Sequence, residues 1–258
     1  MTDGITPAEF AGKVAIVTGG GAALGYAIAR AFARDRAHVV IAGRTHATLA
    51  RAAAAIEKEY GAPVLHVAAD VAEPQDCERM VAAAVDRFGA VDILVNNAAY
   101  FAASPLIDVE AAEAARFFAV NAVGPLNGAR AMAIWTIGHR RSGAIVNVSS
   151  IAAGRPVASL ALYAASKAAL ESLTRSMAVE WAGKGLRVNA VAPGHVKTDG
   201  VLADFRAGRL DEAAMLRHIP DGRIADGDDI ADAVLFLCSG RARHIVGHVL
   251  TVDGGEGF

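Results

Sequence analysis

The feature that most constrains the fold is a regular alternation of β-branched runs and helical stretches along the whole chain. Runs such as VAIVT and HVVIAG are apolar throughout, as strands are when both faces of a parallel sheet are buried. Seven such runs lie at 14–18, 38–43, 63–70, 91–97, 144–150, 187–193 and 248–255. Short strands separated by helices are typical of a doubly wound sheet. The sequence therefore predicts an α/β fold with seven parallel strands and helices on both faces.

The 258 residues are enough for one domain of this kind, and no linker, repeat or low-complexity tract divides them. We therefore expect a single domain over residues 1–258. The stretch 199–226 departs from the alternation of strands and helices, because it is helical but irregular and follows the sixth strand. Ligands of open α/β sheets bind beyond the carboxyl ends of the strands. We interpret this insertion as a mobile lid over the substrate.

Charge and cysteine content argue against several classes of function. The formal net charge is −2, whereas a sequence-independent nucleic-acid binder needs a basic excess. The two cysteines, Cys77 and Cys238, form no CxxC pair, so we expect neither a disulfide framework nor a metal site. No run reaches about 18 apolar residues, and the polar start of the chain does not read as a secretion signal. We therefore expect a cytoplasmic protein that does not enter a membrane.

A glycine-rich turn, TGGGAALG, follows the first strand and opens the first helix. Glycines let the backbone come close to a pyrophosphate, and the N-terminus of a helix presents unpaired N–H groups to it. The position of the turn in the first strand–helix unit makes the motif more specific than glycines alone. We predict a dinucleotide site here, formed by Thr18, Gly19, Gly21, Ala23, Leu24 and Gly25.

A serine, a tyrosine and a lysine stand close together in SIAAGRPVASLALYAASK, residues 150–167. Tyr163 and Lys167 are four positions apart, so a helix places them on one face. An ammonium beside a phenol favours the phenolate, and we expect the pKa of Tyr163 to fall below its usual value near ~10. Such a phenol can exchange a proton near neutral pH. Ser150 ends an apolar strand, where its hydroxyl can hold a substrate oxygen, and the set predicts a carbonyl/alcohol oxidoreductase.

These motifs together resemble the short-chain dehydrogenase/reductase family, and the likeness runs from about residue 11 to residue 255. Besides the glycine turn and the Ser150, Tyr163 and Lys167 set, the matching motifs are NNAA (96–99), Asn121 in FAVNAVG, PGHVKT (193–198) and DGG (253–255). The resemblance implies a Rossmann-type NAD(P)-binding domain. It also implies an enzyme that interconverts a ketone and a secondary alcohol by hydride transfer.

The resemblance further implies a role for each polar residue of the site. Tyr163 donates a proton to the substrate oxygen, and Ser150 orients the carbonyl. Lys167 holds the nicotinamide ribose, and Asn121 holds a water that relays protons to Lys167. Cofactor contacts are implied for Tyr163 and Lys167 and for Asp70, Val71, Asn97, Ala98, Pro193, Gly194, Val196 and Thr198.

Two alanines depart from the pattern of the family. Ala23 replaces the middle glycine of the turn, and Ala99 replaces the glycine of NNAG. The added methyl is expected to be tolerated if the backbone there does not have a positive φ. Alanine at position 23 also resembles the enoyl reductases of the family. Those enzymes have a differently spaced tyrosine–lysine pair without the matched serine, so the spacing here favours ketone chemistry.

The end of the second strand bears on the choice of nucleotide. An acidic residue there would bind the adenosine ribose and repel a 2′-phosphate, but the sequence reads Ala42-Gly43-Arg44-Thr45. A guanidinium suits bidentate contact with a phosphate. We therefore predict that Arg44 favours NADP(H), with NAD(H) as the alternative.

The substrate is left open among several alternatives. The resemblance to 3-oxoacyl-[acyl-carrier-protein] reductases makes a 3-oxoacyl thioester the leading prediction, with Arg140, Arg141 and Lys184 as a docking surface for an acidic carrier protein. The alternative is a sugar or secondary-alcohol dehydrogenase. A regulator that senses NADPH without turnover is disfavoured because the Ser150, Tyr163 and Lys167 set is retained. Relatives in the family mostly form tetramers, so we expect a homotetramer acting on a small-molecule carbonyl or alcohol.

Overall fold

The computed structural model describes residues 8–257; the first seven residues of the polar start, which bear on the signal prediction, and Phe258 lie outside this range. Its centre is one seven-stranded sheet in the order β3-β2-β1-β4-β5-β6-β7, and every pairing is parallel. The strands are β1 (Val14–Thr18), β2 (His38–Gly43), β3 (Val64–Ala68), β4 (Ile93–Asn96), β5 (Gly143–Val148), β6 (Leu186–Pro193) and β7 (Val249–Val252). The predicted doubly wound fold is confirmed, although most strands are shorter than their apolar runs.

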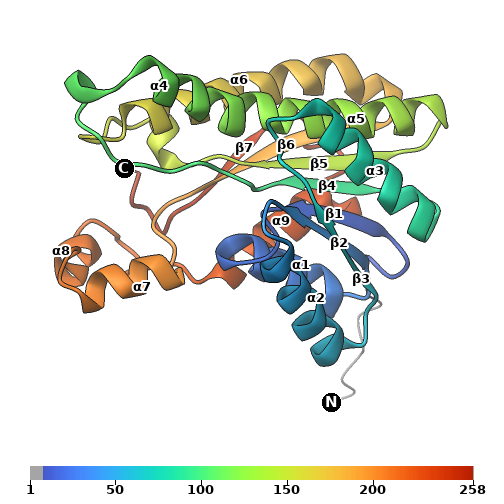
Figure 1. The fold of residues 1–258 in the computed structure, drawn as a ribbon, viewed down its shortest axis with the longest axis horizontal. Helices are drawn as coiled ribbons and strands as arrows, with labels where there is room; N and C mark the ends of the chain where they lie inside the picture. The colour runs from blue at the N-terminus through green and yellow to red at the C-terminus, as the bar shows by residue number, and fades with distance from the viewer. Residues whose placement is uncertain (1–7, 258) are drawn as a thin grey trace.

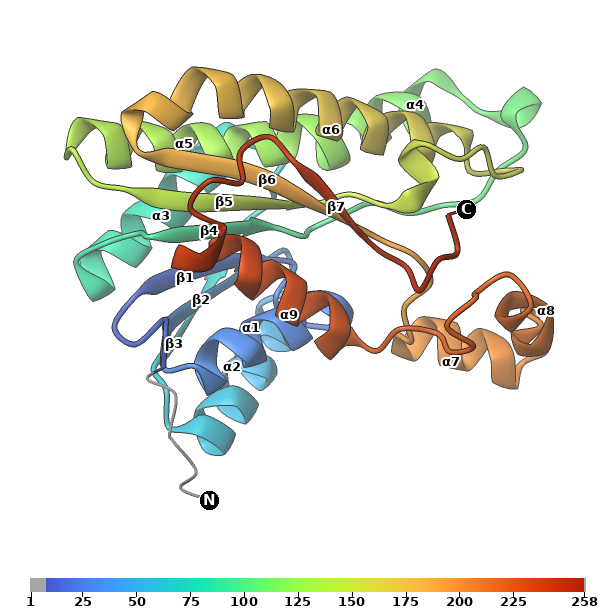
Figure 2. The same cartoon turned by 180° about the vertical axis from the view of Figure 1, so that it is seen from behind.

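Helices cover both faces of the sheet, as Figures 1 and 2 show. One layer consists of α1 (Ala23–Arg34), α2 (His46–Tyr60) and α9 (Gly227–Cys238), and the other of α3 (Pro74–Phe88), α5 (Gly124–Gly138) and α6 (Ala161–Trp181). Ile28, Phe32 and Ile56 are fully buried in the first layer. Met80 and Met132 are fully buried in the second. Because apolar side chains pack on both sides, the central strands have no polar face.

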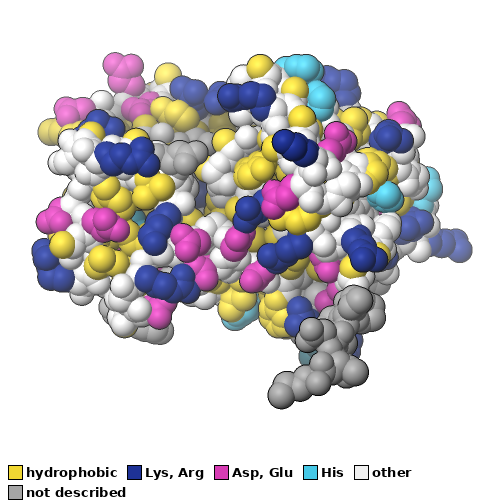
Figure 3. All heavy atoms as spheres, turned by 90° about the horizontal axis from the view of Figure 1, so that it is seen from below, with side chains coloured by type: hydrophobic (Ala, Val, Ile, Leu, Met, Phe, Trp, Pro, Cys, Tyr) yellow, Lys and Arg dark blue, Asp and Glu magenta, His cyan; other side chains and the backbone are white. Residues whose placement is uncertain are grey.

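The outer face of the first layer carries mixed charges. Seen from the side of α1, α2 and α9, basic and acidic side chains are interspersed and form no single-sign patch (Figure 3). Two ion pairs join α1 to α9 on this layer, Arg30 with Asp228 at 2.7 Å and Arg34 with Asp232 at 3.0 Å. Exposed pairs of this kind contribute little to stability individually.

The helical region between β4 and β5 is interrupted. It divides into α4 (Ala111–Phe118), a π-helical turn (Ala119–Val123) and α5. The turn carries Asn121, whose side chain is buried and bonded to Tyr100, and π turns of this kind occur often at functional sites. Gly124 allows close packing directly after the turn, since a Cβ there would lie 2.7 Å from a methyl of Val71.

The predicted lid region forms two helices, α7 (Asp199–Arg206) and α8 (Glu212–Leu216). Both lie away from the two helical layers, beyond the strand ends (Figures 1 and 2). A parallel bridge between Val196 and Ala225 joins the two ends of the insertion. Its motion stays a prediction. Short 3₁₀ turns lie at Leu106–Asp108, Ile151–Ala153, Ala182–Lys184 and Gly240–Ala242.

A row of buried polar side chains connects the sheet to the second layer of helices. Asn96 Nδ2 on β4 donates to Asn147 Oδ1 on β5 at 2.9 Å, and Asn147 Nδ2 donates to Thr174 Oγ1 on α6 at 2.8 Å. Asn96 and Asn147 are register partners in the sheet.

Across residues 8–257, the structure contains no helix that combines the length and the apolarity needed to cross a bilayer.

Candidate active site

The glycine turn joins β1 to α1 and is fixed to the end of β4. Thr18 Oγ1 accepts hydrogen bonds from the backbone N–H groups of Asn97 and Ala98, each at 3.0 Å, and Asn97 Nδ2 donates to Thr18 O. Gly19 has a φ of +67°, and a Cβ on Gly25 would collide with the Gly19 carbonyl oxygen. The turn therefore needs glycine at both positions, and it leaves the N-terminus of α1 without a side-chain cap, as a pyrophosphate site requires.

Ala23 does not meet the condition under which we expected its methyl to be tolerated. Its φ is +48°, in the left-handed region that L residues disfavour. The side chain is exposed, so the cost lies mainly in the backbone conformation itself. Ala99, by contrast, is absent from the residues with positive φ among those described.

A cavity of about 310 Å³ lies beyond the carboxyl ends of β1, β2, β3 and β4. Six of the predicted cofactor residues line it, namely Gly19, Gly21, Arg44, Asp70, Val71 and Ala98. Thr45, Thr48 and Leu49 of the α2 start line it as well. The size and the glycine cradle suit the adenosine and pyrophosphate part of a dinucleotide.

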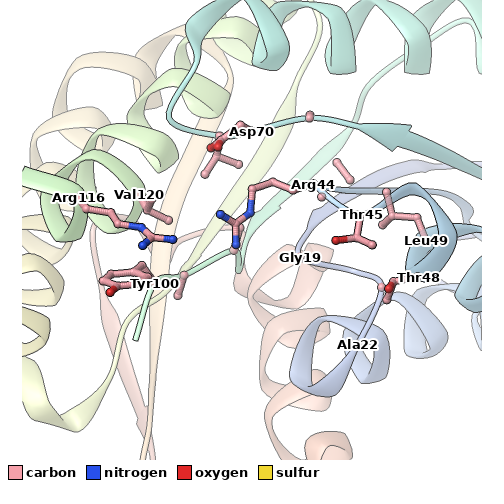
Figure 4. Close-up of a pocket in the computed structure, with 17 residues that line it drawn as sticks. Gly19, Ala22, Arg44, Thr45, Thr48, Leu49, Asp70, Tyr100, Arg116 and Val120 are labelled. Atoms are coloured by element: carbon pink, nitrogen blue, oxygen red, sulfur yellow. The ribbon is translucent and has the colours of Figure 1, made fainter. Parts of the chain in front are cut away.

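Arg116 is a further cation of this cavity that the sequence analysis missed. It extends from α4, and its guanidinium carbon lies 4.1 Å from the ring centroid of Tyr100. Figure 4 shows the guanidinium groups of Arg44 and Arg116 reaching into the cavity from opposite sides. Among the described side chains, neither has a carboxylate within ion-pair distance. The cavity thus presents two guanidinium groups without a direct ion-pair partner, together with the carboxylate of Asp70.

A second cavity of about 190 Å³ brings together three of the four predicted catalytic residues and several of the predicted cofactor residues. Ser150, Tyr163 and Lys167 line it with residues from the glycine turn, from the end of β4 and from the end of β6. These further lining residues are Leu24, Asn97, Ala99, Val148, Ser149, Pro193, Gly194 and Val196. Segments distant in the sequence therefore meet where the hydride transfer is predicted.

The predicted acidity of Tyr163 is wrong for this arrangement. Burial raises the pKa of Tyr163 above its ordinary value, and the hydrogen bond with Ser150 only partly offsets that rise. Lys167 Nζ donates to Val148 O at 2.7 Å and lies 5.7 Å from the ring centroid of Tyr163. The amine is therefore directed at the end of β5, and burial lowers the pKa of Lys167 to about 8. The protonated phenol dominates at neutral pH.

Asn121 holds the loop after β4. Its Oδ1 accepts from Tyr100 N at 2.7 Å, and its Nδ2 donates to Tyr100 O at 2.9 Å and to Ser166 Oγ at 3.0 Å. Ser166 Oγ donates in turn to the carbonyl of Tyr163. The side-chain amide is thus engaged by protein groups and orders the Tyr100 loop against α6. The water relay that we predicted for Asn121 stays a prediction.

The remaining predicted residues support the site from outside the two cavities. Thr198 Oγ1 accepts from Val201 N and caps α7. Thr18, Ala23 and Gly25 shape the glycine turn but do not line either cavity. In the part of the chain from residue 8 to residue 257, no group of three or more histidine, cysteine or acidic side chains is placed to hold a metal ion.

Comparison with known proteins agrees with this geometry. A family model described as enoyl-(acyl carrier protein) reductase matches residues 21–256. A sorbitol dehydrogenase of Cereibacter sphaeroides is 37% identical over 253 residues, which cover 95% of this chain and 97% of that protein. An uncharacterized short-chain type dehydrogenase/reductase of Sinorhizobium fredii is 40% identical over 248 residues, which are 95% of this chain but 43% of that longer protein.

A solved structure is similar over nearly the whole chain. The L-sorbose reductase of Gluconobacter frateurii, in complex with NADPH and L-sorbose, has a TM-score of 0.91 and 30% identity, covering 97% of this chain and 98% of that one. The chain is therefore an oxidoreductase that acts on CH–OH groups with a nicotinamide cofactor. It belongs to the short-chain dehydrogenase/reductase family.

Proposed function

We propose that the protein interconverts a secondary alcohol and a ketone in a polyhydroxylated small molecule, such as a polyol and its ketose, with NADP(H). The observation that carries the proposal is the cavity in which Ser150, Tyr163 and Lys167 meet the end of the glycine turn. The sorbitol dehydrogenase and the L-sorbose reductase support the substrate class, because their names describe a polyol and a ketose. This was the alternative to our leading prediction.

The leading prediction, a 3-oxoacyl thioester delivered by a carrier protein, has less support. Arg140 and Arg141 precede β5, and Lys184 precedes β6. Because both strands are parallel and Ser150 follows β5, these basic residues lie at the opposite edge of the sheet from the reaction cavity. A carrier docked there would sit across the sheet from Tyr163, which disfavours delivery of a thioester to the cavity. The enoyl reductase in the description of the family model concerns C=C reduction, for which the Ser150, Tyr163 and Lys167 set is not spaced.

Tyr163 and Ser150 have distinct tasks in this proposal. When bound, the nicotinamide accepts the hydride from the alcohol carbon or gives it to the ketone carbon. Tyr163 holds the proton that the substrate oxygen gains on reduction and loses on oxidation. Its raised pKa keeps the phenol protonated at neutral pH, which suits proton donation to a ketone. Ser150 lines the same cavity as Tyr163, and its hydroxyl can hold the substrate oxygen beside the phenol.

The preference for NADP(H) is supported by Arg44. It lies directly after β2 in the 310 Å³ cavity, without an acidic partner among the described side chains. A bond between guanidinium and phosphate contributes about 1.5–3 kcal/mol, so Arg44→Ala should raise the KM for NADPH by roughly ten- to a hundredfold. The KM for NADH should change little. A wild-type enzyme that prefers NADH would contradict this part of the proposal.

The test of the reaction is a turnover screen with NADPH and NADP⁺ over ketoses, polyols, simple ketones and 3-oxoacyl thioesters. Tyr163→Phe removes the proton donor and keeps the ring, so the rate should fall by about a hundredfold or more. The control is nucleotide binding, followed by NADPH fluorescence, which should persist. Near wild-type turnover in that variant would refute the assignment, and turnover of thioesters alone would refute the substrate class.

The predicted tetramer remains part of the proposal. Ile134 on α5 and Val179 on α6 leave apolar side chains 59% and 85% exposed on adjacent helices. Burying such side chains between copies of the chain would stabilise an assembly by the hydrophobic effect. Light scattering after size exclusion gives the mass directly, and a monomer at micromolar concentration would contradict the prediction.

A further inference from the structure

The C-terminal segment forms a hook beside the reaction cavity. Asp253 accepts hydrogen bonds from the backbone N–H groups of Gly255 and Gly257, at 2.9 and 2.8 Å. Gly254 and Gly255 both have positive φ, at +63° and +88°, so the chain reverses sharply after β7. This turn directs the side chain of Glu256 under the loop that follows β6.

Glu256 is a buried carboxylate with two bonds to one residue. It is 5% exposed, its Oε2 accepts from the backbone N of His195 at 3.0 Å, and its Oε1 accepts from His195 Nδ1 at 2.7 Å. Arg155, in the loop after Ser150, donates to the main-chain oxygen of Glu256 at 2.8 Å. A Cβ on Gly194 would lie 2.7 Å from Glu256 Oε2, so only glycine admits the carboxylate there.

These contacts determine which nitrogen of His195 is available. An ionised carboxylate only accepts hydrogen bonds, so Nδ1 carries the proton and Nε2 is left as the free polar atom. Among the described residues Nε2 has no partner, and the side chain is 45% exposed. The ring is therefore held in one orientation by a buried group while its outer edge stays open.

His195 does not itself line the reaction cavity, but it stands in the loop that does. Pro193, Gly194 and Val196, which flank His195, line that cavity together with Tyr163 and Ser150. The anchoring residue Arg155 comes from the loop that follows Ser150. A histidine in an exposed loop is by itself usually only a surface residue. The buried Glu256 is the observation that changes this interpretation.

We propose that His195, oriented by Glu256, binds a hydroxyl group of the substrate distant from the reacting carbon and so selects polyhydroxylated substrates. His195 is then a specificity-determining residue, and Glu256 is a positioning residue that acts through it. This inference rests on the proposed polyol and ketose function. It adds a polar contact that a simple secondary alcohol cannot use.

Two variants of His195 distinguish the role of Nε2, which faces outward, from that of Nδ1, which binds Glu256. His195→Asn can keep a donor near Nδ1 and removes the distal polar atom, whereas His195→Gln places a polar atom near Nε2. Loss of one hydrogen bond should raise the KM for a hexitol about tenfold in His195→Asn and less in His195→Gln, with kcat changed little. Glu256→Gln, which unsettles the ring orientation, should also raise the KM.

The matched substrate is 2-butanol, which has the reacting group but no distal hydroxyl. Its kcat/KM should stay within twofold of wild type in all three variants, and thermal unfolding checks their folding. Equal losses on the hexitol and on 2-butanol would indicate a merely structural role, and an unchanged hexitol KM would also overturn the inference. Failure of the wild type to turn over hexitols or ketoses, with turnover of another substrate class, would instead overturn the proposed function.

Discussion

Replacing Ala23 with glycine should stabilise the protein, although glycine usually destabilises a helix. Ala23 opens α1 with a φ of +48°, a conformation that costs an L residue about 1–2 kcal/mol. Glycine relieves that cost but adds about 0.5–1 kcal/mol through the greater freedom of the unfolded chain. The exposed methyl contributes no packing that would be lost. The midpoints of the two ranges leave a net gain of about 0.75 kcal/mol, which for a chain of this length raises the Tm by about 1.5–3 °C.

The assay is thermal unfolding without nucleotide, followed by circular dichroism at two scan rates. The matched control is Ala55→Gly, since Ala55 is an exposed residue inside α2 that is not among those with positive φ. That variant should lose about 1 kcal/mol and unfold at a lower temperature. The two substitutions are chemically identical, so opposite signs isolate the backbone conformation. If Ala23→Gly lowers the Tm as Ala55→Gly does, the reasoning from φ is refuted.

Three further predictions follow from the same structure. Gly25→Ala should abolish NADPH binding in a fluorescence titration, because its Cβ would collide with the Gly19 carbonyl, whereas Gly138→Ala, with nothing within 4 Å, should bind normally. Burial lowers the pKa of Lys167 from 10.5 to about 8, so between these pH values the folded protein binds fewer protons than the unfolded chain and its stability rises with pH. The stability of wild type relative to Lys167→Met in urea titrations should therefore increase from pH 8 to pH 10, and a constant difference would contradict the burial of the amine. Asn147→Leu should lower the free energy of unfolding by about 1–3 kcal/mol, because it removes the buried hydrogen bonds that join Asn147 to Asn96 and to Thr174. An unchanged urea midpoint would show that these two hydrogen bonds do not stabilise the fold.

Local patterns in the sequence were sufficient for the fold and for much of the site. The apolar runs predicted all seven strands, because a strand buried on both faces admits few polar residues. The spacing of Tyr163 and Lys167 placed both on α6, and Ser150 emerged from the neighbouring strand end as expected. These features depend on residues close in the chain and on a fixed direction for parallel strands.

Features that depend on the folded surroundings were not predicted. The pKa of Tyr163 rises because burial outweighs its polar contacts, and burial of a phenol cannot be read from a four-residue spacing. From the sequence, Arg116 is an ordinary solvated helix residue. Its contact with the ring of Tyr100 is seen only in the folded chain. Glu256 lies 61 positions from His195, and no local signal marks it as a buried partner. The positive φ of Ala23 likewise follows from the geometry of the glycine turn, and alanine at this position gives no sign of it in the sequence.

The hydrogen-bonded pair of Asn96 and Asn147 has a consequence for how the chain finds its native alignment. The runs ILV on β4 and AIV on β5 are so alike that a shift by two residues would bury almost the same apolar surface. Such a slipped pairing would break the hydrogen bond between the two amides in a dry interior, at a cost of about 1–3 kcal/mol. The pair therefore discriminates among competing alignments that hydrophobicity alone would treat as equal. Correct alignment brings Asn97 and Ser150, which follow these strands, into the same small cavity.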